Sequence, residues 1–272
     1  MMRRAQPWLG TLVDITLDSP AAGEAVTAAF VEIARVHRLM SFHDPASDVA
    51  RFNRARAGAF VDVDPHTWNV LQLAAQVAEA CGDCFNLACA SQLVEWAYLP
   101  AATTPAPPFV PGMRAFELDG IGRVRKTADA WIDLGGIAKG YAVDLAIESL
   151  QSHGVDSACV NAGGDLRVFG ASAWPVSVRA ADQPGAIGAQ LALRNAALAT
   201  SAHYFAAKRT PAGILVSALI DGRSGQAVLA RRSVSVRAAS CAVADALTKV
   251  VMVSGDAVHP CLEKFGAAAF II

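Results

Sequence analysis

Long apolar runs are absent from this 272-residue chain, although 54% of its residues are hydrophobic. No stretch approaches the roughly 18 uninterrupted apolar residues of a membrane-spanning helix, so we expect no transmembrane segment. Charge is also scarce, at 17% of residues with a net charge of −1. Without a basic stripe, nucleic acid is not an expected partner. The first ten residues contain Arg3 and Arg4 but no apolar segment, so we expect no export signal in the chain as given and leave the compartment open.

Cysteine is sparse and scattered, with six residues in the whole chain. This scatter indicates reduced, mostly buried thiols. Cys81 and Cys84 form a Cys-x-x-Cys pair, but no second pair or nearby histidine completes a zinc site. A zinc or redox function for this pair is therefore not expected.

Apolar periodicity predicts the secondary structure. Helical spacing predicts long helices at 21–40, 65–81, 137–150 and 241–253, and shorter helices near 48–53, 93–96 and 260–265. Strands are predicted at 10–17, 60–63, 116–118, 124–126, 131–134, 158–161, 166–170, 175–179, 187–193, 197–200, 215–220, 233–237 and 268–272. Short connections favour antiparallel pairing. Long helices beside runs of short strands predict an α+β fold with a mostly antiparallel sheet.

Residues 100–111 contain five prolines, which predicts an irregular surface segment. The strands that follow are short and need a sheet to join. We therefore interpret the region near 100–112 as a loop inserted in one domain that spans 1–272, rather than as a linker between two domains.

Residues 133–144, with the sequence Asp-Leu-Gly-Gly-Ile-Ala-Lys-Gly-Tyr-Ala-Val-Asp, are predicted to end a strand, turn at two glycines and begin a helix. The glycines allow a sharp turn and a close approach to a bound group. A helix N-terminus suits a phosphate, and Lys139 adds a positive charge where the helix dipole prefers an acid. The alternative is a plain strand-to-helix turn with a solvated lysine.

Four further stretches combine polar groups with turns: residues 40–48, 161–165, 200–204 and 242–249. In the last of these, Asp245 begins an apolar helix, with the Thr248 hydroxyl about one turn later. A carboxylate, a hydroxyl and backbone carbonyls are ligands that a hard divalent cation prefers. Taken alone, Asp245 would more simply be an acid at a helix start.

In this order and spacing, the stretches resemble the ApbE family of FAD:protein FMN transferases over most of the chain. The resemblance depends on 133–144, on Asn-Ala-Gly-Gly-Asp at 161–165 and on Ala-Asp-Ala-Leu at 244–247. It implies an enzyme that binds FAD, uses Mg²⁺ and transfers FMN to a threonine of an acceptor flavoprotein, releasing AMP. Family members usually work outside the cytoplasmic membrane.

The resemblance also implies site residues. Contacts to the flavin nucleotide are implied for Met40, Phe85, Asn86, Asp133, Lys139 and Ile220. The Gly136 carbonyl and Asp245 are implied as Mg²⁺ ligands, with Asp245 also catalytic. The metal would neutralise charge on the pyrophosphate.

Two departures from the family pattern affect these expectations. The family's histidine before its late strands is Ala218 here, which removes a plausible base for the acceptor threonine. His203 could substitute as a catalytic group, or could be a packing residue. Four residues after Asp245 the family often has threonine, where this chain has Lys249. The third metal ligand is therefore Thr248 or water.

Two functions follow as hypotheses. The first is Mg²⁺-dependent transfer of FMN from FAD to a protein threonine, which we favour because phosphoryl transfer relies mainly on positioning and charge. The second is an FAD-binding protein that hydrolyses FAD to FMN and AMP or has no catalytic activity. A flavin redox enzyme is a third and weaker alternative.

Overall fold

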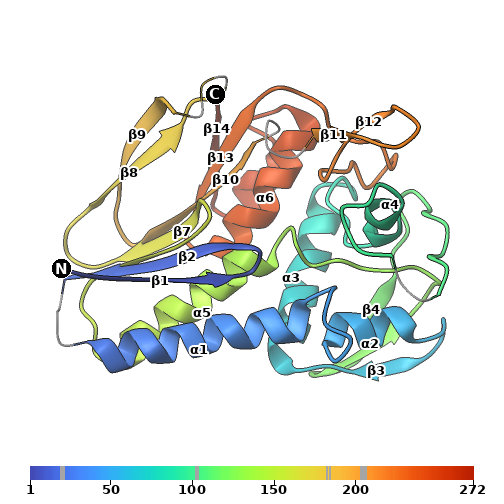
Figure 1. Cartoon of the computed structure of the whole chain (residues 1–272), viewed down its shortest axis with the longest axis horizontal. Helices are drawn as coiled ribbons and strands as arrows, with labels where there is room; N and C mark the ends of the chain where they lie inside the picture. Colours follow the sequence, from blue (N-terminus) through green and yellow to red (C-terminus); the bar gives the residue numbers. More distant parts are fainter. Residues whose placement is uncertain (19–21, 102–103, 182, 184, 203–206) are drawn as a thin grey trace.

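A seven-stranded antiparallel sheet forms the centre of the computed structural model, which describes residues 1–18, 22–101, 104–181, 183, 185–202 and 207–272 (Figure 1). The strands lie in the order β1-β2-β6-β7-β10-β13-β14, and each neighbouring pair is antiparallel. They span Met2–Trp8 (β1), Thr11–Leu17 (β2), Ala158–Ala162 (β6), Asp165–Phe169 (β7), Ala196–Ala202 (β10), Ser233–Ala238 (β13) and Ala268–Ile271 (β14). The predicted α+β class with a mostly antiparallel sheet is confirmed.

Three long helices cover one face of this sheet: α1 (Gly23–Met40), α5 (Ala138–Ser152) and α6 (Cys241–Ser254). Figure 1 shows α1 and α5 side by side, and α6 packs on β10 and β13. Alternate side chains of β2, namely Val13, Ile15 and Leu17, are fully buried in the core beneath these helices. The buried side of β2 therefore packs towards the apolar faces of the helices, as the alternating sequence pattern predicts.

The opposite face of the sheet is covered by a two-stranded hairpin, β8 (Trp174–Arg179) and β9 (Ile187–Leu193). Neighbouring residues of β10 contribute their side chains to two different hydrophobic clusters, one on each face of the sheet. Ala197 and Ala199 belong to the core under the helices, whereas Leu198 packs in a second cluster with Val178 and Leu193 of the hairpin. The sheet is thus buried on both faces in this region.

A smaller unit of sheet and helices lies beside the main sheet, at the lower right of Figure 1. It contains the sheet β3-β5-β4, with α2 and α3 close to it. The remaining elements are β3 (Phe60–Asp62), β4 (Phe116–Leu118), β5 (Arg123–Lys126), α2 (Asp48–Arg54), α3 (Pro65–Ala80), α4 (Ala90–Glu95), β11 (Ala207–Arg209), β12 (Leu215–Ser217) and α7 (Pro260–Lys264). Ser47 and Asp64 cap α2 and α3 by accepting hydrogen bonds from the N–H groups of Ala50 and His66.

Residues 131–134 are not a strand, contrary to the prediction. Their backbone groups bond to a side chain and a loop instead of a neighbouring strand. Ile132 N–H donates to Asn53 Oδ1 at 2.8 Å, Asn53 Nδ2 donates to the Ile132 carbonyl at 3.0 Å, and Asp133 N–H donates to the Leu87 carbonyl at 3.0 Å. An apolar segment can therefore be buried in an extended form without a sheet.

Other boundaries also differ. The edge strand β1 was not predicted, and the predicted strand at 215–220 ends at Ser217, with only an isolated bridge between Ile220 and Ala227 beyond it.

In the proline-rich segment, the described residues between 100 and 112 form neither helix nor strand. Among the described residues, no helix is long and apolar enough to cross a membrane. The single-domain assignment stays a prediction.

Candidate active site

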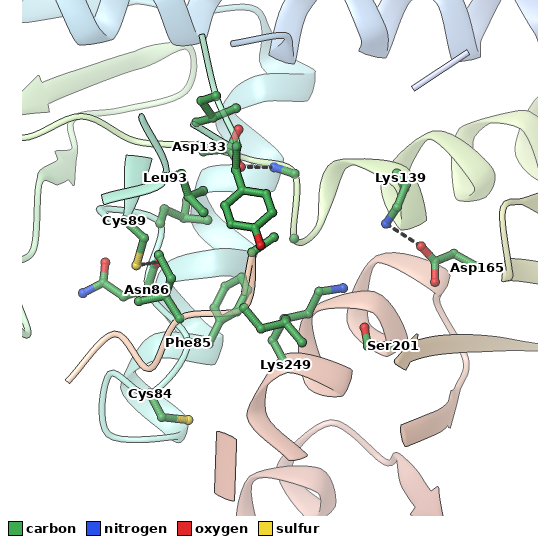
Figure 2. A pocket seen from close by; sticks show the side chains of 18 of the residues that line it. Cys84, Phe85, Asn86, Cys89, Leu93, Asp133, Lys139, Asp165, Ser201 and Lys249 are labelled. Atoms are coloured by element: carbon green, nitrogen blue, oxygen red, sulfur yellow. Dashed lines mark hydrogen bonds and ion pairs between the residues drawn. The ribbon is translucent and has the colours of Figure 1, made fainter. Parts of the chain in front are cut away.

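A cavity of about 460 Å³ lies where the turn after Asp133, the ends of β6 and β10, and α6 meet. Figure 2 shows its side chains from close by. One part of the wall is apolar, with Phe85, Leu93 and Leu219, and another part carries the charged groups Lys139, Asp165 and Lys249. A cavity with an apolar wall and a few convergent polar groups is typical of a ligand site.

Lys139 connects two buried carboxylates. Its Nζ atom donates to Asp165 Oδ2 at 2.6 Å and to Asp245 Oδ2 at 3.4 Å. The Asp165 and Asp245 side chains are 4% and 0% exposed, whereas that of Lys139 is 28% exposed and lines the cavity. Burial lowers the pKa of Lys139, but the two carboxylates outweigh burial and raise it above its ordinary value. Lys139 is therefore held charged at the cavity wall.

Lys249 is the second cation of the wall. Its ammonium contacts the Asp245 carboxylate one helical turn away and donates to the Asp245 main-chain carbonyl at 2.9 Å. Burial raises the pKa of Asp245, but Lys139 and Lys249 outweigh burial and the pKa is lowered. Burial and the nearby Asp245 raise the pKa of Asp165, which has fewer compensating donors. Asp245 is thus the carboxylate that stays ionised to lower pH.

The N-termini of α5 and α6 are capped by each other's carboxylates. Asp245 Oδ2 accepts from the Gly140 N–H in the first turn of α5, at 3.1 Å. Asp144 of α5 accepts from the N–H groups of Cys241 and Ala242 at the start of α6, both at 2.9 Å, and from Ser240 Oγ at 2.7 Å. The positive ends of both helices are therefore neutralised by protein carboxylates. The phosphate expected at the start of α5 would meet Lys139 rather than the Gly140 N–H.

Gly140 allows this close approach of the two helices. A Cβ atom at this position would lie 2.3 Å from the Cys241 carbonyl oxygen and 2.8 Å from the Ala242 Cα. Both neighbours are backbone atoms, so a side chain cannot be accommodated by a rotamer change. Gly140 is thus a helix-packing residue, unlike Gly135 and Gly136 of the turn.

Most of the predicted nucleotide-binding residues line the cavity. They are Phe85, Asn86, Asp133, Lys139 and Ile220, together with the predicted metal ligand Gly136. Met40 does not: it lies at the end of α1 and is buried in the core. His203 lies outside the described residues, so its predicted role stays untested.

Asn86 and Asp133 also have structural bonds. Asn86 Nδ2 donates to the Met113 carbonyl at 3.0 Å, and Asn86 Oδ1 accepts from the Ala88 N–H at 2.9 Å. Asp133 Oδ2 accepts from the Gly135 N–H at 3.0 Å, which shapes the glycine turn. Burial raises the pKa of Asp133 above its ordinary value, although the Gly135 bond opposes this shift.

Two of the predicted Mg²⁺ ligands, Asp245 and Thr248, do not line the cavity, whereas Gly136 does. Thr248 is fully buried, donates to the Asp245 carbonyl at 2.7 Å and bonds with Ser201 Oγ at 2.8 Å. Both oxygens of the Asp245 carboxylate already accept from protein N–H groups. Within the described part of the chain, no group of three or more His, Cys, Asp or Glu side chains could hold a metal ion. As it stands, this donor set does not fit a hard divalent cation.

Two charged residues of the site had no role assigned from the sequence. Asp165 follows the second glycine pair, and Lys249 was considered only as the replacement of a threonine. The i,i+4 spacing of Asp245 and Lys249 is the signal that predicts their contact. Ala218 lines the cavity, so the position of the family's histidine faces the site without an imidazole.

Comparisons with known proteins agree with this geometry. The family model described as "ApbE family" matches residues 9–271. The FAD:protein FMN transferase of Rhodobacter capsulatus is 27% identical over 91% of this chain, and that of Vibrio cholerae serotype O1 is 25% identical over 92%. The chain spans 50% and 80% of these relatives' lengths.

A solved structure shows the same fold. The crystal structure of the ApbE protein from Thermotoga maritima matches with a TM-score of 0.86 and 25% identity, covering 100% of this chain and 94% of the other. Because the family model extends over nearly all of the sequence and the fold agrees, this chain belongs to the ApbE family.

Proposed function

We propose that this protein is an FAD:protein FMN transferase, which moves FMN from FAD to a threonine hydroxyl of an acceptor flavoprotein and releases AMP. The names of the relatives from Rhodobacter capsulatus and Vibrio cholerae support the reaction class. The single observation that carries the proposal is the pair of ammonium groups at the cavity wall, Lys139 and Lys249, each held by the buried carboxylate of Asp245.

The reaction forms one bond and breaks one. The acceptor oxygen attacks the phosphorus of the FMN half, and the bond from that phosphorus to the bridging oxygen of the pyrophosphate breaks. AMP leaves with the bridging oxygen and its electron pair, and the hydroxyl proton passes to solvent or a base. Such transfer depends mainly on positioning and on stabilising negative charge, which Lys139 and Lys249 supply from fixed positions.

The apolar part of the cavity suits the flavin end of FAD. Phe85, Leu93, Tyr98, Leu99 and Leu219 line it. A second cavity of about 630 Å³ adjoins the first and shares Gly163, Thr200 and Ala202 with it. A dinucleotide or an acceptor segment that extends past the charged groups therefore has room on the far side. Mg²⁺ finds no fitting donor set among the described residues, and the proposal does not depend on it.

Hydrolysis of FAD to FMN and AMP is the second candidate function. Ala218 at the cavity wall favours it, because the acceptor hydroxyl lacks an imidazole from that position. Water would then take the place of the acceptor oxygen.

The test is to incubate the protein with FAD and an acceptor that carries an Asp-x-x-Thr-Gly-Ala-Thr type of sequence. Intact-mass spectrometry of the acceptor and chromatography of the nucleotides then separate the outcomes. FMN on the acceptor together with an equal amount of AMP supports transfer. Free FMN and AMP with an unmodified acceptor indicates hydrolysis. FAD that is bound but unchanged contradicts both functions.

A further inference from the structure

We propose that the ammonium of Lys249 takes the place of a divalent cation in this site, so that the protein binds and positions the FAD pyrophosphate without Mg²⁺. This inference rests on the proposed function, and it concerns the residue that stands where the family often has threonine. Its basis is the path of the Lys249 side chain and the bonding of Asp245.

The Lys249 side chain fills the space between Gly136 and Asp245, the two residues implied as metal ligands. A Cβ atom built on Gly136 would lie 3.6 Å from Lys249 Cε and 4.0 Å from its Cγ, so the lysine chain packs along this glycine. From there the ammonium reaches the Asp245 carboxylate and carbonyl. Figure 2 shows Lys249 extending into the site past Phe85.

Each oxygen atom of Asp245 already accepts from at least one protein donor. Lys249 bonds Oδ1, Lys139 and the Gly140 N–H bond Oδ2, and the main-chain carbonyl accepts from Thr248 and Lys249. A metal ion would have to displace an ammonium from a carboxylate that is 0% exposed. Separating a buried charge pair of this kind is costly.

The charge of the cluster also disfavours a dication. Asp165 and Asp245 contribute two negative charges, and Lys139 and Lys249 contribute two positive charges. A divalent cation would therefore enter a cluster without net negative charge and would lie close to two ammonium groups. With a neutral residue at position 249, the same cluster would carry one negative charge and would attract the cation.

Lys249 can also supply part of the positive charge that a divalent cation would place beside the phosphate. Its side chain is 16% exposed and lines the cavity, and an ammonium has three donors. Two of them bond Asp245, which leaves one for a phosphate oxygen. Lys139 approaches from α5 and Lys249 from α6, so two fixed cations can flank one pyrophosphate.

Metal and FAD binding by wild type and by Lys249→Thr test the proposal without an acceptor. Electron paramagnetic resonance measures Mn²⁺ binding, and flavin fluorescence measures FAD affinity in EDTA and in millimolar Mg²⁺. Lys264→Thr, at an exposed lysine of α7, is the matched control. The wild type and the control should show no Mn²⁺ site and the same FAD affinity under both conditions.

In EDTA, Lys249→Thr should bind FAD about tenfold more weakly than the wild type. In Mg²⁺ it should recover its FAD affinity, and it should acquire a Mn²⁺-binding site. A stoichiometric Mn²⁺ site in the wild type, with FAD affinity that collapses in EDTA, overturns the proposal whatever the variant does. These are binding measurements, so a failure of FMN transfer to an acceptor would contradict the proposed function but would leave this result interpretable.

Discussion

Asp144 and Asp245 each cap the helix that carries the other. Asp144, on α5, accepts the N–H groups that begin α6, and Asp245, on α6, accepts an N–H group in the first turn of α5. This reciprocal capping fixes the two helix starts against each other at the point where Lys139 and Lys249 reach the cavity. The fold therefore sets the spacing of the two ammonium groups through two aspartates that do not line the cavity.

Asp144→Asn tests the structural half of this arrangement. The amide keeps one acceptor oxygen but loses the negative charge. That charge strengthens the hydrogen bonds that Asp144 accepts from the N–H groups of Cys241 and Ala242 and from the Arg167 guanidinium. We expect a loss of about 2 kcal/mol in the free energy of unfolding, measured by urea denaturation. FMN transfer should fall more than FAD affinity. Glu148→Gln, at an exposed position of the same helix, should change neither quantity, and equal effects of the two variants would refute the capping role.

Gly140→Ala tests the close approach of α5 and α6. The new methyl group would meet the backbone of Cys241 and Ala242, so the helices must separate. We expect a loss of about 3 kcal/mol in stability, visible as a lower melting temperature. Gly23→Ala is the control, because a Cβ atom at Gly23 has no neighbour within 4 Å. A Gly140→Ala protein as stable as that control would contradict the packing.

Asp245→Asn should abolish turnover, because Lys139 and Lys249 lose the carboxylate that holds them, while part of the FAD affinity remains. It should also lower the free energy of unfolding at neutral pH by about 3 kcal/mol. The folded pKa of Asp245 is lowered, since Lys139 and Lys249 outweigh its burial.

The sign of the pH dependence follows from this lowered pKa. The stability that Asp245 contributes is present above its unfolded pKa of about 4 and is lost as the pH falls through the folded value. The stability difference between wild type and Asp245→Asn should therefore be largest near neutral pH and narrow in acid. A difference that grows as the pH falls from 5 to 3, measured by chemical denaturation, is the contrary result.

Lys139→Met removes the cation that links the two carboxylates. The loss of a charged hydrogen bond to a phosphate should weaken FAD binding by about 10- to 100-fold. Isothermal titration calorimetry measures this change. Lys264→Met, at an exposed lysine of α7, is the control and should leave the affinity unchanged. An affinity loss below twofold in Lys139→Met would exclude a direct contact with the ligand.

Much of the fold could be predicted because its signals are local. The helical spacing in 21–40 and 241–253 and the alternation in 10–17 each bury one face, and the structure confirms these elements. The edge strand β1 escaped prediction because its residues are mostly exposed or half-buried, so no alternation marks it. Residues 131–134 have the apolar pattern of a strand, but distant groups at Asn53 and Leu87 bind their backbone.

The candidate site, like the fold, could be predicted from the sequence only in part. The glycine turn and the acid of α6 could be recognised from their order in the chain, and the fold brings Lys139 and Asp245 together. The direction of the Lys249 side chain could not be recognised, since spacing alone does not decide whether it turns towards Asp245 or into solvent. Met40 was carried over from the resemblance and is buried in the core.

The most direct test of the proposed FMN transfer is the mass of an acceptor flavoprotein after incubation with this protein and FAD, in EDTA and in Mg²⁺. We predict a gain equal to FMN less one water, on a threonine, with release of AMP in both conditions. An acceptor that stays unmodified in both conditions, while FAD remains intact, would contradict the proposed function.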